Sequence, residues 1–341
     1  MTSDRHSRNK AAVTPFRRAL YDYDPAGLKA VVTELFAPHC RIRMSFPFEE
    51  VAGPEGLLAA VYGPLAEAIP DLERRDTMVI AGSDGVHDWV GCGGYYTGIF
   101  AAPWLGIPPT CQQVSLRFHE FFRMRDGRVA EVQALWDIPE VMMQAGVWPM
   151  SPSLGLEWHV PGPATQDGIL GGPRDEAKSN ASAKLVEDML AALKRHASGG
   201  VAAMELDRYW HPKMNWYGPA GIGTSRQIVG FRRAHQIPFL NAMPDRRRAV
   251  DVPSHLFGDG DYVGFTAWPG LAMTLSGDGW LGIAPAGQEI TMRSLDFWRC
   301  EAGLIRENWV LVDLLHVYHQ LGVNVFQRMT ERTPAYRDPF R

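Results

Sequence analysis

The chain has 341 residues, of which 46% are hydrophobic and 21% charged, and its formal net charge is −4. A chain of this length can form two hydrophobic cores. It has no surplus of basic residues that would attract the phosphate backbone of a nucleic acid. No apolar run approaches the roughly 18 residues of a membrane span, and the polar start of the chain is unlike a signal peptide. The four cysteines show no CxxC spacing, so we expect reduced thiols in a cytoplasmic protein.

Apolar spacing in the first part of the chain predicts helices that precede a run of strands. Residues 28, 31, 32, 35 and 36 are apolar, which is helical spacing, whereas residues 41–46 alternate as in a strand. The predicted helices cover residues 16–23, 28–36 and 56–68, the strands cover residues 41–46, 74–81, 87–97, 114–124 and 128–137, and a short helix follows at residues 138–145.

The last two of these strands form a predicted hairpin around Arg125-Asp126-Gly127. The pattern suits a three-residue loop with a bulge, in which Met124 faces Arg128. Continued along the strands, this register places Leu135 opposite Arg117, Gln133 opposite His119 and Asp137 opposite Ser115.

Residues 151–178 are rich in proline, glycine and polar side chains and show no sustained period, so we expect a linker there. A helix at residues 179–197 follows, capped by Ser179 or Asn180. The remaining predictions are helices at residues 201–209, 227–242 and 314–321, a strand at residues 213–217 and further strands up to residue 313.

One stretch of the chain occurs twice. Residues 111–147 align without a gap with residues 287–323, and 12 of the 37 aligned positions are identical. Ordinary composition would give roughly two or three identities by chance. The match continues upstream at an offset of 174 residues. A period of this length indicates two copies of one whole domain, each with helices followed by a curved antiparallel sheet, which is an α+β fold.

Three motifs recur in both copies: a Pro-Asp pair after a helix, a hairpin glycine that leads to a glutamate, and a closing segment with an aspartate and Gln-x-Gly. They are Ile69-Pro70-Asp71, Gly127–Glu131 and Asp137–Gly146 in the first copy, and Met243-Pro244-Asp245, Gly303–Glu307 and Trp309–Gly322 in the second. With the order of elements, these motifs make the chain resemble the SnoaL-like polyketide cyclase family over most of both copies.

The resemblance implies two tandem cone-shaped domains of the nuclear-transport-factor type, at residues 10–150 and 179–330, with residues 151–178 as linker. It also implies that the copies pack sheet to sheet as a pseudo-dimer within one chain. Family members include cyclases, isomerases, dehydratases and proteins without known activity. In the characterised cyclases the aspartate before the last helix is the acid/base of an intramolecular aldol closure, and Asp137 and Asp313 match that position.

Alternation along the first copy's hairpin places Asp137 on one face with Arg117, His119 and Gln133. Burial would raise the pKa of Asp137 and a nearby cation would lower it, which tunes a carboxyl for proton transfer near neutral pH. We predict that Asp137 moves a proton next to a carbonyl and that Arg117, His119 or Gln133 holds the enolate oxygen. The alternative is that Asp137 and His119 form a satisfied polar pair of the core.

The matching face of the second copy carries Arg293, Trp309 and Asp313 and has no histidine. There Asp313 is either an acid/base or the structural partner of Arg293, and Tyr217 lines the pocket or the core. We favour the first copy as the active one and expect a small-molecule substrate without metal, cofactor, nucleic acid or membrane; a further homo-oligomer stays open. The rival functions are a non-catalytic ligand-binding protein, with Asp137 sealed against Arg117, and an interaction scaffold with a large exposed apolar patch.

Overall fold

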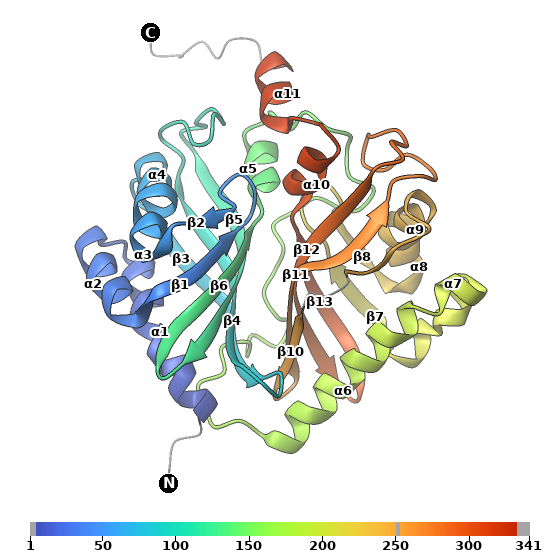
Figure 1. The fold of residues 1–341 in the computed structure, drawn as a ribbon, viewed down its shortest axis with the longest axis horizontal. Helices are drawn as coiled ribbons and strands as arrows, with labels where there is room; N and C mark the ends of the chain where they lie inside the picture. The colour runs from blue at the N-terminus through green and yellow to red at the C-terminus, as the bar shows by residue number, and fades with distance from the viewer. Residues whose placement is uncertain (1–4, 250–252, 333–341) are drawn as a thin grey trace.

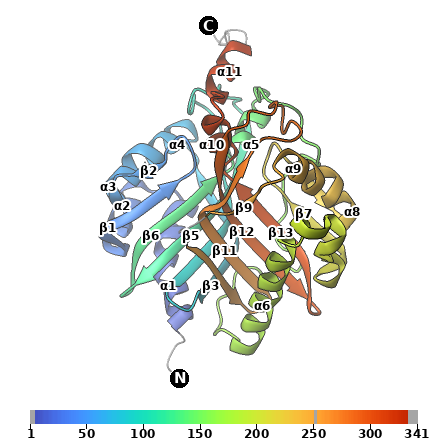
Figure 2. The ribbon, with the colours of Figure 1, turned by 45° about the vertical axis from the view of Figure 1, so that its right-hand side comes forward.

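Two similar halves with facing sheets make up the computed structural model, which describes residues 5–249 and 253–332 (Figure 1). Most helices of each half lie on the far side of its own sheet, away from the other half, whereas the short helices that follow the last long strand of each copy, at residues 138–144 and 314–320, lie at one end of the molecule between the halves (Figures 1 and 2). The predicted α+β architecture of two tandem domains is therefore confirmed.

The first copy has one mixed sheet. Its helices are α1 (Arg5–Tyr21), α2 (Pro25–Leu35), α3 (Gly53–Gly56), the π-helical η1 (Leu57–Tyr62), α4 (Gly63–Ala68) and α5 (Ile138–Gln144). Its strands are β1 (Phe36–Met44), β2 (Glu50–Val51), β3 (Glu73–Ser83), β4 (Asp88–Ile99), β5 (Gln113–Arg125) and β6 (Arg128–Trp136). The sheet order is β2-β1-β6-β5-β4-β3, and β1 runs parallel to β6. The prediction of a fully antiparallel sheet was therefore wrong at this strand pair. The long connection from β1 to β6 allows the crossover that a parallel pair requires.

The second copy repeats this plan. Its helices are α6 (Glu176–Leu193), α7 (His196–Gly199), η2 (Val201–Met204), η3 (Leu206–Arg208), α8 (Gln227–Phe231), the π-helical η4 (Arg232–Gln236), α9 (Ile237–Ala242), α10 (Leu314–Gln320) and α11 (Val325–Arg332). Its strands are β7 (Trp210–Tyr217), β8 (Thr224–Arg226), β9 (Arg247–Arg248), β10 (Ser254–Asp259), β11 (Tyr262–Thr274), β12 (Glu289–Glu301) and β13 (Leu304–Val312). The sheet order is β10-β11-β12-β13-β7-β8, with β9 beside β11 and β7 parallel to β13. Among the residues described, no helix is both long and apolar enough to cross a membrane.

Two helix predictions in the second copy were wrong in detail. The N-cap of α6 is Asp175, whose carboxylate accepts a hydrogen bond from the Lys178 amide at 3.0 Å, so Ser179 lies inside the helix. Residues 201–209 form two short 3₁₀ turns rather than one helix, because the left-handed backbone of Glu205 (φ 46°) separates η2 from η3.

The predicted register of the β5–β6 hairpin was also wrong. Arg125 pairs with Arg128, so the loop contains only Asp126 and Gly127, and both have positive φ as in a type I′ turn. A bulge lies between Arg123 and Met124. In consequence His119 pairs with Leu135 and Phe121 with Gln133, a shift of two residues that leaves each side chain on its predicted face.

A separate hydrophobic cluster holds the two sheets together. Phe121 stacks on Phe297 of the second copy with ring centroids 4.9 Å apart. Glycines allow this close approach, because a Cβ atom at Gly91 would lie 2.9 Å from the Phe297 ring and one at Gly264 would lie 3.0 Å from the Phe121 ring. The two copies therefore pack sheet to sheet, as the resemblance implies.

The segment between the copies contacts both of them. Tyr95 of the first copy donates a hydrogen bond to the Val160 carbonyl at 2.9 Å, and Trp309 of the second donates to the Pro161 carbonyl at 2.9 Å. Trp158 donates to Thr224 at 3.0 Å. These contacts fix the segment over the edge of the interface between the sheets.

Candidate active site

The face that carries the predicted catalytic residues packs against the other copy. We call the side of each sheet that faces its own helices the inner face, and the side that faces the other sheet the outer face. His119 lies on the outer face, where its Nδ1 is 2.6 Å from the Leu295 carbonyl oxygen of the second copy. The sequence did not show which face of the strand meets the other copy. Nearly all of β5 is buried, so alternation separates its two faces but does not tell which one meets the helices.

Asp137 is sealed against Arg117 rather than paired with His119. The Arg117 Nη2 is 3.1 Å from Asp137 Oδ2, and the Ala220 amide of the second copy donates to the same oxygen at 2.9 Å. Burial raises the pKa of Asp137 to about 6, although Arg117 and the Ala220 hydrogen bond act against this rise. This arrangement favours a structural role for Asp137.

Asp313 of the second copy makes the equivalent contacts with an arginine of its own copy and a backbone amide of the first copy. Arg293 Nη1 is 3.1 Å from Asp313 Oδ2, and the Phe46 amide of the first copy donates to that oxygen at 3.0 Å. Burial raises its pKa to about 6, opposed mainly by Arg293. Phe46 and Ala220 are 174 residues apart and so occupy matching positions. Each aspartate therefore accepts a hydrogen bond from a backbone amide of the other copy, and this contact links the two halves.

A small cavity lies between these aspartates. It has a volume of about 10 Å³, and its lining includes Asp137, Asp313, Phe46 and Ala220. A cavity of this size has room for about one water molecule. Both predicted acids are thus buried beside a hollow, but the hollow is too small for a substrate.

The other predicted site residues also have partners within the protein. Gln133 accepts a hydrogen bond from Thr266, Tyr217 donates to Glu307 at 3.1 Å, and Trp309 bonds to the segment between the copies. Burial lowers the pKa of His119 to about 3, so its ring is neutral. Within the described parts of the chain, no three His, Cys, Asp or Glu side chains are close enough to hold a metal ion.

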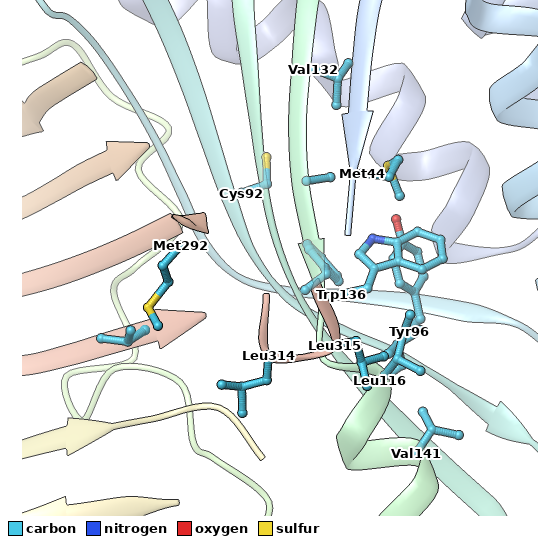
Figure 3. Packing of buried hydrophobic residues seen from close by; sticks show 14 of the residues in the cluster. Met44, Cys92, Tyr96, Leu116, Val132, Trp136, Val141, Met292, Leu314 and Leu315 are labelled. Atoms are coloured by element: carbon cyan, nitrogen blue, oxygen red, sulfur yellow. The ribbon is translucent and has the colours of Figure 1, made fainter. Parts of the chain in front are cut away.

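The inner face of the first copy carries a buried carboxylate with several donors. Glu120 accepts hydrogen bonds from Arg74 at 2.6 Å, Tyr96 at 2.9 Å and Trp136 at 3.0 Å. The Arg74 guanidinium lies 4.1 Å from the centroid of the Phe118 ring. Figure 3 shows Tyr96 and Trp136 close together in this core, and their ring centroids are 5.1 Å apart. Both carboxylate oxygens of Glu120 therefore have hydrogen-bond partners within the first copy.

The inner face of the second copy carries a carboxyl without such donors. Asp296 is 7% exposed, and among the residues that the structure describes it accepts one hydrogen bond, from the Ser294 hydroxyl at 2.7 Å. Asp296 Oδ1 is the one carboxylate oxygen, among the residues described, that is buried without a hydrogen-bond partner. Burial raises the pKa of Asp296 to about 7, and the Ser294 hydroxyl lowers it only in part. A buried carboxyl of this kind is typical of a functional site.

Strand pairing shows that Glu120 and Asp296 occupy the same place. Glu120 lies between Cys92 and Ala134, and Asp296 lies between Phe265 and Val310. By the same pairing, four other positions correspond between the copies. They are Arg74 with Arg248, Tyr96 with Leu271, Phe118 with Ser294 and Trp136 with Val312.

These exchanges open the second copy to solvent. Tyr96, Phe118 and Trp136 are buried, whereas Leu271, Ser294 and Val312 are each smaller and partly exposed. Deeper on the same face, Trp298 and Trp216 replace Phe122 and Ile42. The inner face of the second copy thus has partly exposed side chains around the buried carboxyl of Asp296, and the large rings of Trp298 and Trp216 lie on the same face.

Two polar groups near this face also lack partners. Trp298 Nε1 and His235 Nδ1 are buried without a hydrogen bond among the described residues. His235 stacks on Trp216 with a centroid distance of 4.3 Å, and burial lowers its pKa to about 3, with a smaller effect of Arg246. The second copy therefore offers a carboxyl, an indole N–H and a neutral imidazole in an aromatic setting.

Comparison with protein families decides the relationship. The family described as SnoaL-like polyketide cyclase matches residues 17–145 and 195–321, which is one match in each copy and most of the chain. The chain belongs to the SnoaL-like polyketide cyclase family. Both copies of the chain are thus SnoaL-like, in agreement with the repeat and the shared fold.

Solved structures similar to the chain each match about one copy. A candidate SnoaL-like polyketide cyclase from Jannaschia sp. CCS1 is 26% identical, with 40% of this chain and 91% of that chain covered and a TM-score of 0.36. IdmH, a candidate polyketide cyclase from Streptomyces antibioticus, is 20% identical over 40% of this chain and 98% of its own, with a TM-score of 0.35. AclR, a candidate hydroxylase from Streptomyces galilaeus, is 21% identical over 41% and 86%, with a TM-score of 0.35. No curated protein matches the chain in a sequence comparison.

Proposed function

We propose that the chain is a cofactor-independent enzyme that moves a proton on a carbonyl-bearing small molecule, as in a cyclisation, isomerisation or dehydration. Asp296 on the inner face of the second copy is the proton-transfer group. The supporting observation is its buried oxygen without a hydrogen-bond partner, beside side chains that solvent reaches. Asp137 and Asp313, in this proposal, hold the two copies together.

The pKa of Asp296, about 7, suits this chemistry. A general acid or base works best when its pKa lies near the working pH, because both protonation states are then available. As a carboxylate, Asp296 takes a proton from the carbon next to the carbonyl; as a carboxylic acid, it returns the proton. The free N–H of Trp298 is a donor for the enolate oxygen that forms between these steps.

Hydrogen exchange tests the proposal without knowledge of the natural substrate. Enolisable ketones and 1,3-dicarbonyl compounds are incubated with the protein in D₂O, and NMR follows exchange at the carbon next to the carbonyl. We expect catalysed exchange by the wild type, and a loss of about 10²–10⁴-fold in Asp296→Asn, which is the usual value of a positioned acid or base. Equal exchange by the wild type and Asp296→Asn would contradict the role of Asp296.

Asp137→Asn is the matched control for this experiment. It changes an aspartate of similar burial and raised pKa that lies in the interface. We expect the folded fraction of Asp137→Asn to exchange at the wild-type rate. Selective loss of exchange in this variant, with its fold intact, would return the catalytic role to Asp137.

The second candidate function is non-catalytic binding of a small molecule on the same face. The ion pairs that occupy Asp137 and Asp313 favour it, because these residues match the catalytic position in the characterised cyclases. In that case a ligand would bind, and no variant would change its exchange or turnover.

A further inference from the structure

The first copy shows which groups satisfy a carboxylate at this place in the fold. Glu120 accepts hydrogen bonds from three groups of its own copy: the guanidinium of Arg74, the hydroxyl of Tyr96 and the indole N–H of Trp136. Arg74 is 1% exposed, and its guanidinium fills the space between Glu120 and the Phe118 ring. Both oxygens of Glu120 are thus occupied by groups of the same copy.

The second copy lacks each of these three donors. Leu271 and Val312, which replace Tyr96 and Trp136, have no polar group in their side chains. Arg248 corresponds to Arg74 but lies exposed on β9, where it donates to the Ser254 hydroxyl at 3.2 Å. Asp296 consequently keeps one short contact, with Ser294, and one oxygen without a partner.

We propose that the second copy binds a small planar molecule whose hydroxyl or amino group donates to Asp296, and that Arg74, Tyr96 and Trp136 fill the equivalent place in the first copy. The inference rests on the proposed function for the location of the site. It adds the chemical class of ligand, an enol, a phenol or a similar N–H or O–H donor, and it assigns one site to each chain.

The surroundings of Asp296 support a flat ligand without negative charge. Trp298 and Phe265 offer ring surfaces on the same face, and the two rings pack edge to face with centroids 6.2 Å apart. Aromatic faces of this kind suit a planar ligand. No ion pair of Asp296 occurs among the described residues, so a negatively charged group would meet a carboxyl without a compensating cation.

A matched pair of probes tests the donor. 2-Naphthol and its methyl ether have the same ring system, but only 2-naphthol has an O–H to donate. NMR titration of the wild type should give an affinity for 2-naphthol at least about tenfold higher than for the ether, as expected for a donor that reaches a buried acceptor. Equal affinities, or binding of neither probe up to the solubility limit, would overturn the proposal.

Three variants locate the binding. Asp296→Leu removes the acceptor and should abolish the preference for 2-naphthol. Leu271→Tyr supplies the phenol that Tyr96 supplies in the first copy, and it should weaken 2-naphthol binding about tenfold even if Asp296→Leu does not fold. Glu120→Gln changes the first copy and should leave both affinities unchanged. If Glu120→Gln alone alters the preference, the site lies in the first copy and the proposal is wrong.

The probes also separate this inference from the proposed function. If 2-naphthol binds as expected while no carbonyl compound exchanges in D₂O, the catalytic proposal fails and the ligand class stands. If exchange depends on Asp296 but the two probes bind alike, Asp296 is catalytic and the ligand donor is wrong.

Discussion

The two copies share one fold but treat the same carboxyl position differently. In the first copy the carboxylate of Glu120 is enclosed by three donors of that copy, whereas in the second copy Asp296 has one hydroxyl donor and partly exposed neighbours. Buried polar groups are normally satisfied, because an unpaired one costs about 1–3 kcal/mol. The comparison therefore assigns stability to the first copy and ligand chemistry to the second.

The largest expected effect concerns the two corresponding arginines. Arg74→Met should lower the free energy of unfolding by about 3–5 kcal/mol, because it leaves Glu120 buried without its cation. Arg248→Met, the matched control at the exposed position, should change it by no more than about 0.5 kcal/mol. Denaturant unfolding of both variants measures the contrast. Similar losses would mean that the two copies do not differ in this way.

The next effect is a dependence of stability on pH that belongs to Asp296. Its pKa is about 7 in the folded protein, against an ordinary value of 3.8, so the folded state binds more protons between these values. The stability contributed by neutral Asp296 is therefore present below about pH 4 and is lost as the pH rises through 7. Relative to Asp296→Asn, the wild type should lose on the order of 2–4 kcal/mol over this range.

Unfolding curves of the wild type and Asp296→Asn at several pH values test this prediction. Other buried acids, such as Glu140, titrate in both proteins and cancel in the difference. A difference that is flat between pH 4 and 8 would show that Asp296 is not desolvated in the folded protein.

The smallest effect compares the two aspartates at the interface. Asp137→Asn and Asp313→Asn each weaken an ion pair, and we expect a loss of about 1–3 kcal/mol. The loss should be larger for Asp137→Asn, because Arg293 keeps a second carboxylate, Glu49, at 2.6 Å. Thermal unfolding of the two variants measures the order. The reverse order would contradict the roles of these contacts.

The fold could be predicted because the sequence itself shows the repeat, and because the hairpin glycines mark their turns locally. Gly127 and Gly303 both have positive φ in their turns, as a hairpin requires. The face of the site could not be predicted, because β5 is buried on both sides and residues of both faces are apolar or paired. The choice of Asp137 followed the position of the catalytic aspartate in the characterised cyclases, whereas in this structure Asp137 and Asp313 make matching contacts between the copies.

The sequence contained a signal for Asp296 that depends on difference rather than identity. Glu120 aligns with Asp296, so an acid is present in both copies, while Tyr96 and Trp136 give way to Leu271 and Val312. Only the strand pairing shows that these positions surround one carboxyl, because the alignment near β11 contains insertions. The position of Arg248 outside the site depends on the backbone of β9 and has no local signal.

A crystal structure of the chain with bound 2-naphthol tests the central claim most directly. The account predicts that the ligand lies on the inner face of the second sheet, with its oxygen within about 3.2 Å of Asp296. It also predicts that Glu120 keeps its contacts with Arg74, Tyr96 and Trp136. A ligand beside Glu120, or between Asp137 and Asp313, would contradict the division of roles between the two copies.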